Sequence, residues 1–163
     1  MLREMQVSGL TLDPANNAPI VMLREAQGTR VMPIWIGVIE ASAIAFELEG
    51  VALSRPMTHD LLQTAITELG AAVAQVAIVE LRDNTYYARI ELTQQERTIA
   101  LDARPSDAIA LALRAKATIL CEESVLERAQ ARVETPADGE AAAAASGANE
   151  SEVPPTPELG PLP

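Results

Sequence analysis

The sequence has little of the side-chain chemistry on which many enzymes rely. It holds one cysteine, one histidine and one lysine among 163 residues. The single cysteine, Cys121, excludes an internal disulfide and any zinc cluster built from cysteines; because it ends the apolar run 117–121, we interpret it as a packed thiol. The single His59 excludes mechanisms that need two imidazoles from one chain. The single Lys116 argues against a nuclease centre built from carboxylates and a lysine.

Aromatic rings, phosphate-binding loops and long apolar runs are also scarce. Only the Tyr86–Tyr87 pair could offer rings for stacking bases, and strand alternation would send one of the two inward. No glycine-rich phosphate loop, dinucleotide fingerprint or His-Glu-x-x-His motif is present. No apolar run reaches the ~20 residues of a membrane helix. The first residues turn polar at once, so we expect no signal peptide and a soluble, cytoplasmic protein with no membrane partner.

Positive charge is limited, and it ends before the chain does. The chain carries 12 basic and 23 acidic side chains, a net charge of −11, and every basic residue precedes Val133. This balance does not favour strong non-specific binding to nucleic acid, which would need a local arginine cluster. Residues 133–163 are rich in Ala, Glu, Gly, Ser and Pro. We therefore predict a folded domain at 1–132 and a disordered acidic tail at 133–163.

Hydrophobic periodicity predicts both strands and helices. Strand patterns cover 2–12, 20–25, 29–36, 73–82, 86–92 and 97–102, with a short strand at Thr118; helix patterns cover 37–50, 58–69, the residues after Pro105, and 122 to about 132. A bulge is expected near Ser8-Gly9, an edge position for the strand with Pro33, and a hairpin turn at Asp83-Asn84. This order predicts an α+β fold with a largely antiparallel or mixed sheet of six to seven strands and three to four helices.

The stretch 99–114 places polar residues at the start of a nearly all-apolar helix. Pro105 suits the first helical position, and Asp107 lies in the first turn, where a carboxylate faces the positive end of the helix dipole. Residues 108–113 are all apolar, so this helix is expected to be covered on most sides. Its one wet end, a common location for sites, is expected to carry Asp102, Arg104, Ser106 and Asp107.

A second stretch, 54–62, repeats this pattern. It places Arg55 and Pro56 before a helix, with Asp60 in the opening turn and His59 beside it. If folding brings the two helix starts side by side, their polar residues form one shared acidic hollow. We therefore expect the function of the chain to be located there.

The residues at these two helix starts suit phosphodiester hydrolysis assisted by a metal. Asp102 and Asp107, with Asp60 or Glu40, could hold a hard divalent cation through oxygen ligands. The cation would activate a water, and arginine would hold the phosphate. His59 could act as the general base or orient the water. The spacing matches no known metal motif.

The helix expected at 37–50 carries apolar residues on two sides. At about 100° per residue, Glu40 and Glu47 fall on one line, and Ser42 and Glu49 fall on the opposite line. Such a helix is covered twice. The sheet would provide one cover, and the other would be a helix of the same chain or a second subunit.

A purely structural interpretation also exists for each candidate. Thr58 is a natural helix cap, and the histidine beside it is more often a satisfied structural group. Asp60 and Asp107 suit the helix dipole without any catalytic role. Arg55 and Arg104 could simply form exposed ion pairs with nearby acids.

Three separated blocks of the sequence resemble the bifunctional nuclease family, also known as a domain of unknown function in bacteria and plants. They are Met32-Pro-Ile-Trp-Ile-Gly37 followed by Glu40-Ala41, Arg55-Pro-Met-Thr-His-Asp-Leu-Leu62, and Leu101-Asp-Ala-Arg-Pro-Ser-Asp-Ala-Ile-Ala-Leu-Ala112. The likeness covers about residues 1–130. It implies an α+β domain that self-associates, with a dimer as the first expectation, and that degrades both DNA and RNA. It also implies a divalent cation, Mg²⁺ or Mn²⁺, as cofactor.

The same resemblance implies a set of site residues, to which we assign roles from their chemistry. The expected catalytic residues are His59, Asp60, Asp107 and Glu40. The expected substrate-binding residues are Arg55, Arg104 and Ser106. The expected metal ligands are Asp60, Asp102 and Asp107. The alternative function is a non-catalytic oligomeric binding or regulatory module, in which the polar helix starts surround a small anion.

Overall fold

The structure is a computed structural model, and it describes residues 1–134, with side chains through residue 131. Apart from its first two residues, which belong to the last helix, the predicted tail at 133–163 lies outside the described residues. The elements are β1 (Leu2–Leu12), β2 (Pro19–Glu25), β3 (Val31–Trp35), α1 (Val38–Leu48), α2 (Thr58–Glu68), β4 (Ala72–Arg82), β5 (Thr85–Gln94), β6 (Arg97–Ala103), α3 (Pro105–Ala115), β7 (Thr118–Glu122) and α4 (Glu123–Glu134).

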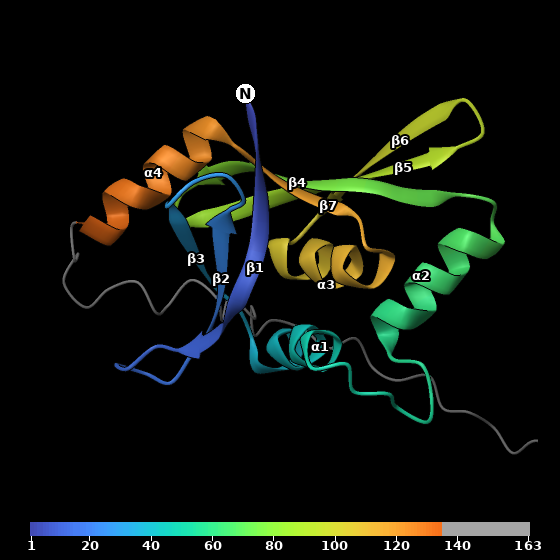
Figure 1. Ribbon diagram of the computed structural model, residues 1–163, viewed down its shortest axis with the longest axis horizontal. Helices are drawn as coiled ribbons and strands as arrows, with labels where there is room; N and C mark the ends of the chain where they lie inside the picture. Colours follow the sequence, from blue (N-terminus) through green and yellow to red (C-terminus); the bar gives the residue numbers. More distant parts are fainter. Residues whose placement is uncertain (135–163) are drawn as a thin grey trace, which may run out of the picture.

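The seven strands of residues 1–134 belong to one mixed sheet. Its order is β3-β2-β1-β7-β4-β5-β6, so the late strand β7 lies between two antiparallel meanders (Figure 1). β7 pairs antiparallel with β1 and parallel with β4. The seven-stranded mixed sheet and the four helices of the described part of the chain confirm the predicted α+β class.

Three local features of the sheet occur where the sequence predicts them, whereas two register shifts of β4 against β5, at Val73/Gln75 and at Ile78/Glu80, were not predicted. The register of β1 against β2 shifts between Val7 and Gly9, which confirms the expected bulge. Asp83 and Asn84 both have positive φ, 46° and 67°, as a tight hairpin turn requires. Pro33 lies in β3, an edge strand, where its missing N–H costs little.

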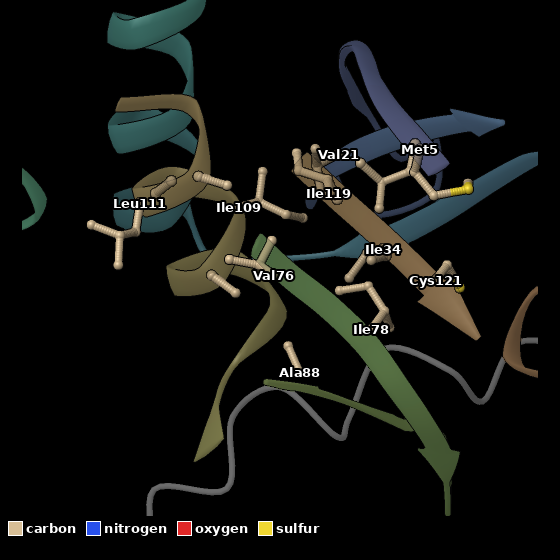
Figure 2. Packing of buried hydrophobic residues seen from close by; sticks show 14 of the residues in the cluster. Met5, Val21, Ile34, Val76, Ile78, Ala88, Ile109, Leu111, Ile119 and Cys121 are labelled. Carbon is tan, nitrogen blue, oxygen red and sulfur yellow. The ribbon is translucent and has the colours of Figure 1, made fainter. Parts of the chain in front are cut away.

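Helix α3 lies at the centre of the helical layer. It packs against α1 and α2 on one side and against β4 and β5 on the other. Figure 2 shows Ile109 pointing toward Val76 and Ile119 of the sheet, whereas Leu111 lies on the other side of the helix. Both side chains are fully buried, and burial of each contributes ~1.5–3 kcal/mol. The expectation that this helix is covered on most sides is confirmed.

Helix α4 packs against β3, β4 and β7, and its start is fixed by ion pairs. Arg30 Nη1 donates to Glu123 Oε1 at 2.6 Å, and Arg3 also pairs with Glu123. Arg30 Nη2 lies 2.9 Å from Glu25 Oε1, and Arg3 lies 3.9 Å from the same oxygen. These four residues, Arg3, Glu25, Arg30 and Glu123, are called the α4 anchor below.

Helix α1 packs against α3 and against strands β1 and β2, so a helix of the same chain and the sheet both cover it, as its pattern predicts. Ala43 and Ile44 are buried, and the helix packs on α3. At its start Val38 and Ile39 are 70% and 81% exposed. These two apolar side chains at the start of the helix stay exposed within residues 1–134. No helix in the described part of the chain is both long enough and apolar enough to cross a membrane.

Candidate active site at three helix starts

The starts of α1, α2 and α3 each place an acidic residue at the third helical position. Glu40 occupies this position in α1, Asp60 in α2 and Asp107 in α3. Arg104 is the extended residue before α3, and Pro105 begins that helix, as the sequence predicts. The three acids lie where each helix presents unpaired N–H groups and positive dipole charge.

Side chains from the three helices form one hydrogen-bonded chain. His59 Nε2 lies 3.1 Å from Asp107 Oδ1, which joins α2 to α3. Arg104 grips Asp107 with two donors, Nε at 2.7 Å and Nη2 at 3.2 Å. Arg104 Nη1 also donates to Glu40 Oε1 at 2.8 Å, which joins α3 to α1. These four residues, Glu40, His59, Arg104 and Asp107, are called the helix-start cluster. Its His59–Asp107 contact confirms that the two helix starts lie side by side.

The helix-start cluster combines half-buried acids with an exposed arginine. The side chains of His59 and Asp107 are 13% and 31% exposed, whereas that of Arg104 is 65% exposed. Burial acts to raise the pKa of Asp107, but hydrogen bonds from Arg104 and His59 outweigh it and hold that pKa below its usual value. The same bond with Asp107 raises the pKa of Arg104. Asp107 is therefore an ionised acceptor at neutral pH, suited to orient an imidazole.

Gly37 makes room for the carboxylate of Glu40. A Cβ at position 37 would collide with Glu40 Oε2, because the side chain folds back over the residue before α1. The other oxygen of this carboxylate receives Arg104. The glycine in front of α1 therefore helps to set the Glu40–Arg104 contact.

Asp60 has different hydrogen-bond partners from Asp107. Its Oδ1 accepts from Arg114 Nε at 2.5 Å, and its Oδ2 accepts from the backbone N–H of Met57 at 2.7 Å. The hydrogen bond from Arg114, followed by that from Met57, holds the pKa of Asp60 below its usual value. Met57 rather than Thr58 is the N-cap residue, so the predicted cap is wrong by one position. The carboxylate of Asp60 thus closes the start of α2 and binds α3.

Asp102 is not brought to the helix-start cluster. In the register of β5 and β6 it lies opposite Arg89, so these two side chains share one face of the sheet. Its neighbours Leu101 and Ala103 share the other face with the buried Ala88. Asp102 is exposed, and its carboxylate makes no hydrogen bond or ion pair within residues 1–134. The expected role of Asp102 as a metal ligand at the start of α3 therefore stays a prediction.

Ser106 and Arg55 differ in their surroundings. Ser106 is 6% exposed, so its predicted position at a wet helix end is wrong: the second residue of α3 already faces the packed interior. Arg55 is exposed and forms no ion pair with the described residues. It lines a pocket of about 220 Å³ together with Asp60 and Arg114. The substrate-binding roles of Ser106 and Arg55 stay predictions.

A metal site remains a prediction as well. Among residues 1–134, no three His, Cys, Asp or Glu side chains are grouped so that they could hold an ion. Asp60 and Asp107 each have an arginine partner, and these are different arginines. The described side chains therefore do not form a metal cage by themselves.

Sequence analysis missed Arg114, the partner of Asp60. Its side chain is 4% exposed, and it also donates to the backbone oxygens of Ala43 and Ala110. One signal was available, because Arg114 is the first charged residue after the apolar run of α3. Lone charges on buried helices usually have a buried partner.

Comparisons with known proteins place these observations in a family. Residues 21–134 match the model of the bifunctional nuclease domain. A protein of Mycobacterium tuberculosis described as uncharacterised is 43% identical over 141 residues, 86% of this chain and 84% of the relative. Bifunctional nuclease 1 of rice, Oryza sativa subsp. indica, is 31% identical over 110 residues, 66% of this chain and 33% of the rice protein. Bifunctional nuclease 1 of Arabidopsis thaliana is 25% identical over 105 residues, 62% of this chain and 32% of the plant protein. The helix-start cluster lies within the matched region, and the chain belongs to the bifunctional nuclease domain family.

Proposed function

We propose that this protein hydrolyses phosphodiester bonds in DNA and RNA at the helix-start cluster. The observation that carries the proposal is the His59–Asp107 contact at 3.1 Å, in which a half-buried carboxylate orients the only imidazole. Membership of the bifunctional nuclease domain family supports the reaction class. The rice and Arabidopsis relatives carry the name bifunctional nuclease, which also supports it.

The proposed reaction uses His59 as the general base. With Nε2–H donating to Asp107, the other ring nitrogen takes a proton from water as the water oxygen attacks phosphorus. The bond from phosphorus to the leaving oxygen then breaks, and the leaving oxygen takes up a proton from solvent water. Asp107 stays ionised throughout, and it stabilises the imidazolium and holds its orientation.

Arg104 and Arg55 are the proposed phosphate ligands. Arg104 is 65% exposed although it pairs with two acids, so its guanidinium can still face a substrate. Arg55 is exposed and has no ion-pair partner among the described residues. Guanidinium groups bind phosphate oxygens through charge-assisted pairs, and the nearby helix N-termini add positive potential. Arg55 and Arg104 would together supply the local arginine cluster that a chain of net negative charge needs to bind nucleic acid.

We also propose that Mg²⁺ or Mn²⁺ assists the reaction. Because the described side chains form no metal cage, the ion would be held by one or two carboxylates, with Asp107 or Glu40 as candidates, together with waters and substrate phosphate. Such an ion would supply charge stabilisation at the phosphate. The roles of His59 and the arginines given above do not depend on it.

The test is an assay of the purified full chain on labelled single-stranded DNA and RNA, with Mg²⁺, with Mn²⁺ and with EDTA. We expect His59→Gln to lower the cleavage rate about 100-fold or more while the melting temperature stays near that of the wild type. Glu127→Gln, which changes an exposed residue of α4, is the matched control and should cleave normally. Equal cleavage by His59→Gln and wild type would place the activity in another site or in a contaminant. Cleavage that persists in EDTA would refute the metal requirement.

A non-catalytic oligomeric module is the second candidate, and one observation favours it. Val38 and Ile39, two adjacent apolar residues at the start of α1, are 70% and 81% exposed. We propose that a second copy of the chain covers them. Ile39→Glu should then weaken dimerisation about tenfold or more in light scattering and sedimentation, whereas Leu69→Glu, at a residue 74% exposed, should not. A monomeric wild type would refute the dimer.

A further inference from the structure

A small pocket lies between the end of α1 and the start of α2. It measures about 220 Å³. Its lining combines apolar and charged side chains: Phe46, Glu47, Val51, Leu53, Arg55, Pro56, Met57, Asp60 and Arg114. Asp60 directly follows His59 in α2, so the pocket and the proposed catalytic histidine share one helical turn.

The most buried charge of the pocket has hydrogen-bonding capacity to spare. The side chain of Arg114 is 4% exposed. Its Nε and Nη1 are occupied by Asp60, Ala43 and Ala110. Within residues 1–134, its Nη2 donates no hydrogen bond, and Arg114 is one of the residues that line the pocket. Among the described residues no buried side-chain nitrogen or oxygen lacks a hydrogen-bond partner, so this unpaired Nη2 is in contact with solvent, where a ligand with an oxygen or nitrogen acceptor can reach it.

The charges of the lining show what kind of ligand suits it. Two arginines, Arg55 and Arg114, face two acids, Glu47 and Asp60, so the pocket carries no net charge. A neutral ring with both acceptors and donors fits this balance better than an anion does. Phe46 adds an aromatic surface, which gives a planar ring a stacking partner. A nucleobase has all of these properties.

The size of the pocket limits the ligand to one such ring. Pockets for drug-sized ligands measure roughly 300–1,000 Å³, and this pocket is smaller. Arg55 is exposed, so it can meet the phosphate attached to a bound base.

We propose that this pocket holds one unstacked base of a nucleic acid strand, next to the phosphate that the helix-start cluster cleaves. The inference rests on the proposed nuclease function and adds the substrate class. Nη2 of Arg114 binds the edge of the base, Phe46 supports its face, and Arg55 holds the adjoining phosphate. A base inside a duplex cannot reach such a pocket without leaving the stack. The preferred substrate is therefore single-stranded DNA or RNA.

The test compares wild type with two pocket variants on a single-stranded oligonucleotide and on its duplex. Leu53→Trp fills the pocket from a residue that is 46% exposed, and Leu12→Trp, at a distant residue 58% exposed, is its matched control. Arg55→Ala removes the phosphate contact, and Arg97→Ala, another exposed arginine without an ion pair among the described residues, is its control. Binding is measured by fluorescence anisotropy and cleavage by gel assay, and melting temperatures verify folding.

We expect the wild type to bind and cleave the single strand at least about tenfold better than the duplex. Leu53→Trp should lose about tenfold in single-strand binding, and Leu12→Trp should lose nothing. Arg55→Ala should reduce the slope of log affinity against log salt by about 0.7, and Arg97→Ala should leave the slope unchanged.

Two results would refute the base-binding pocket without refuting the nuclease proposal. One is equal cleavage of the single strand and the duplex by the wild type. The other is that the pocket variants cleave and bind as well as their control variants do. If the wild type cleaves nothing in any metal, the nuclease proposal fails, and the binding arm still decides the pocket. Single-strand binding that Leu53→Trp weakens and Leu12→Trp keeps would support the base site without catalysis. Binding that both tryptophan variants retain would refute it.

Discussion

Two clusters of charged side chains join distant parts of this chain, and they are built differently. In the α4 anchor, Arg3 and Arg30 both pair with Glu25 and with Glu123, so two positive and two negative charges form a closed ring. The helix-start cluster is instead an open chain from His59 through Asp107 and Arg104 to Glu40.

The difference between the two clusters indicates different tasks. Every charge of the α4 anchor has two partners inside the cluster, and Glu25 is only 10% exposed, so little is left for a ligand. The open chain ends in a histidine and passes through an arginine that is 65% exposed. Histidine can exchange a proton near neutral pH, and an exposed guanidinium can still bind phosphate. The first arrangement suits stability, and the second suits a site.

The largest expected effects come from removing one acid of each cluster. Asp107→Asn leaves His59 without a charged orienting partner, so cleavage should fall about 100-fold or more while melting changes little. Glu25→Gln leaves Arg3 and Arg30 with one carboxylate instead of two, so it should lower the melting temperature by about 5 °C and leave cleavage intact. The measurements are cleavage of a single-stranded oligonucleotide and thermal unfolding by circular dichroism. If both substitutions changed both quantities alike, the division of tasks would be wrong.

A pair of glycines allows a finer test of the same division. A Cβ at Gly37 would collide with the carboxylate of Glu40, and a Cβ at Gly28 would collide with that of Glu25. Neither glycine has a left-handed backbone, so alanine acts through the displaced acid and not through backbone strain. Gly37→Ala should therefore lower cleavage about threefold to tenfold through a shifted Arg104. Gly28→Ala should lower the melting temperature by about 3 °C. Swapped outcomes would contradict the assignment of the two clusters.

Much of the fold can be predicted from the sequence because local rules determine it. The bulge near Gly9, the Asp83-Asn84 turn and the start of α3 at Pro105 depend on the backbone preferences of a few residues. The side-by-side helix starts can also be predicted from two matching Arg-Pro segments. The position of β7 between β1 and β4 cannot, because strand order depends on contacts far apart in the sequence.

The candidate site is harder to predict than the fold, since it depends on side-chain direction and on distant partners. Asp102 is five residues from Asp107, yet strand alternation turns it to the face of Arg89. Asp60 pairs with Arg114 of α3, which lies 54 residues further along the chain. Phe46 becomes a pocket wall only when the loop after α1 folds beside α2. No local sequence pattern predicts these contacts between distant residues.

The smallest expected effect is a loss of folding stability at acidic pH, and it tests the α4 anchor alone. Hydrogen bonds from Arg30 and then Arg3 lower the pKa of Glu123 to about 2 from an ordinary value of 4.5. The unfolded chain therefore binds a proton at this residue before the folded chain does, so stability rises with pH in this window. The stabilisation is complete above pH 4.5 and disappears as the pH falls toward 2.

Glu123→Gln should be less stable than the wild type at pH 7, and the difference should shrink between pH 4.5 and 2. The measurement is the free energy of unfolding in urea at a series of pH values. Glu127→Gln, on an exposed turn of the same helix, provides the control, and its difference from wild type should stay small throughout. A gap for Glu123→Gln that is constant with pH would mean that packing of the side chain, and not its paired charge, fixes the start of α4. The contrast between a closed ring of charges and an open chain would then lose its electrostatic basis at the α4 anchor, while the His59–Asp107 pair would be unaffected.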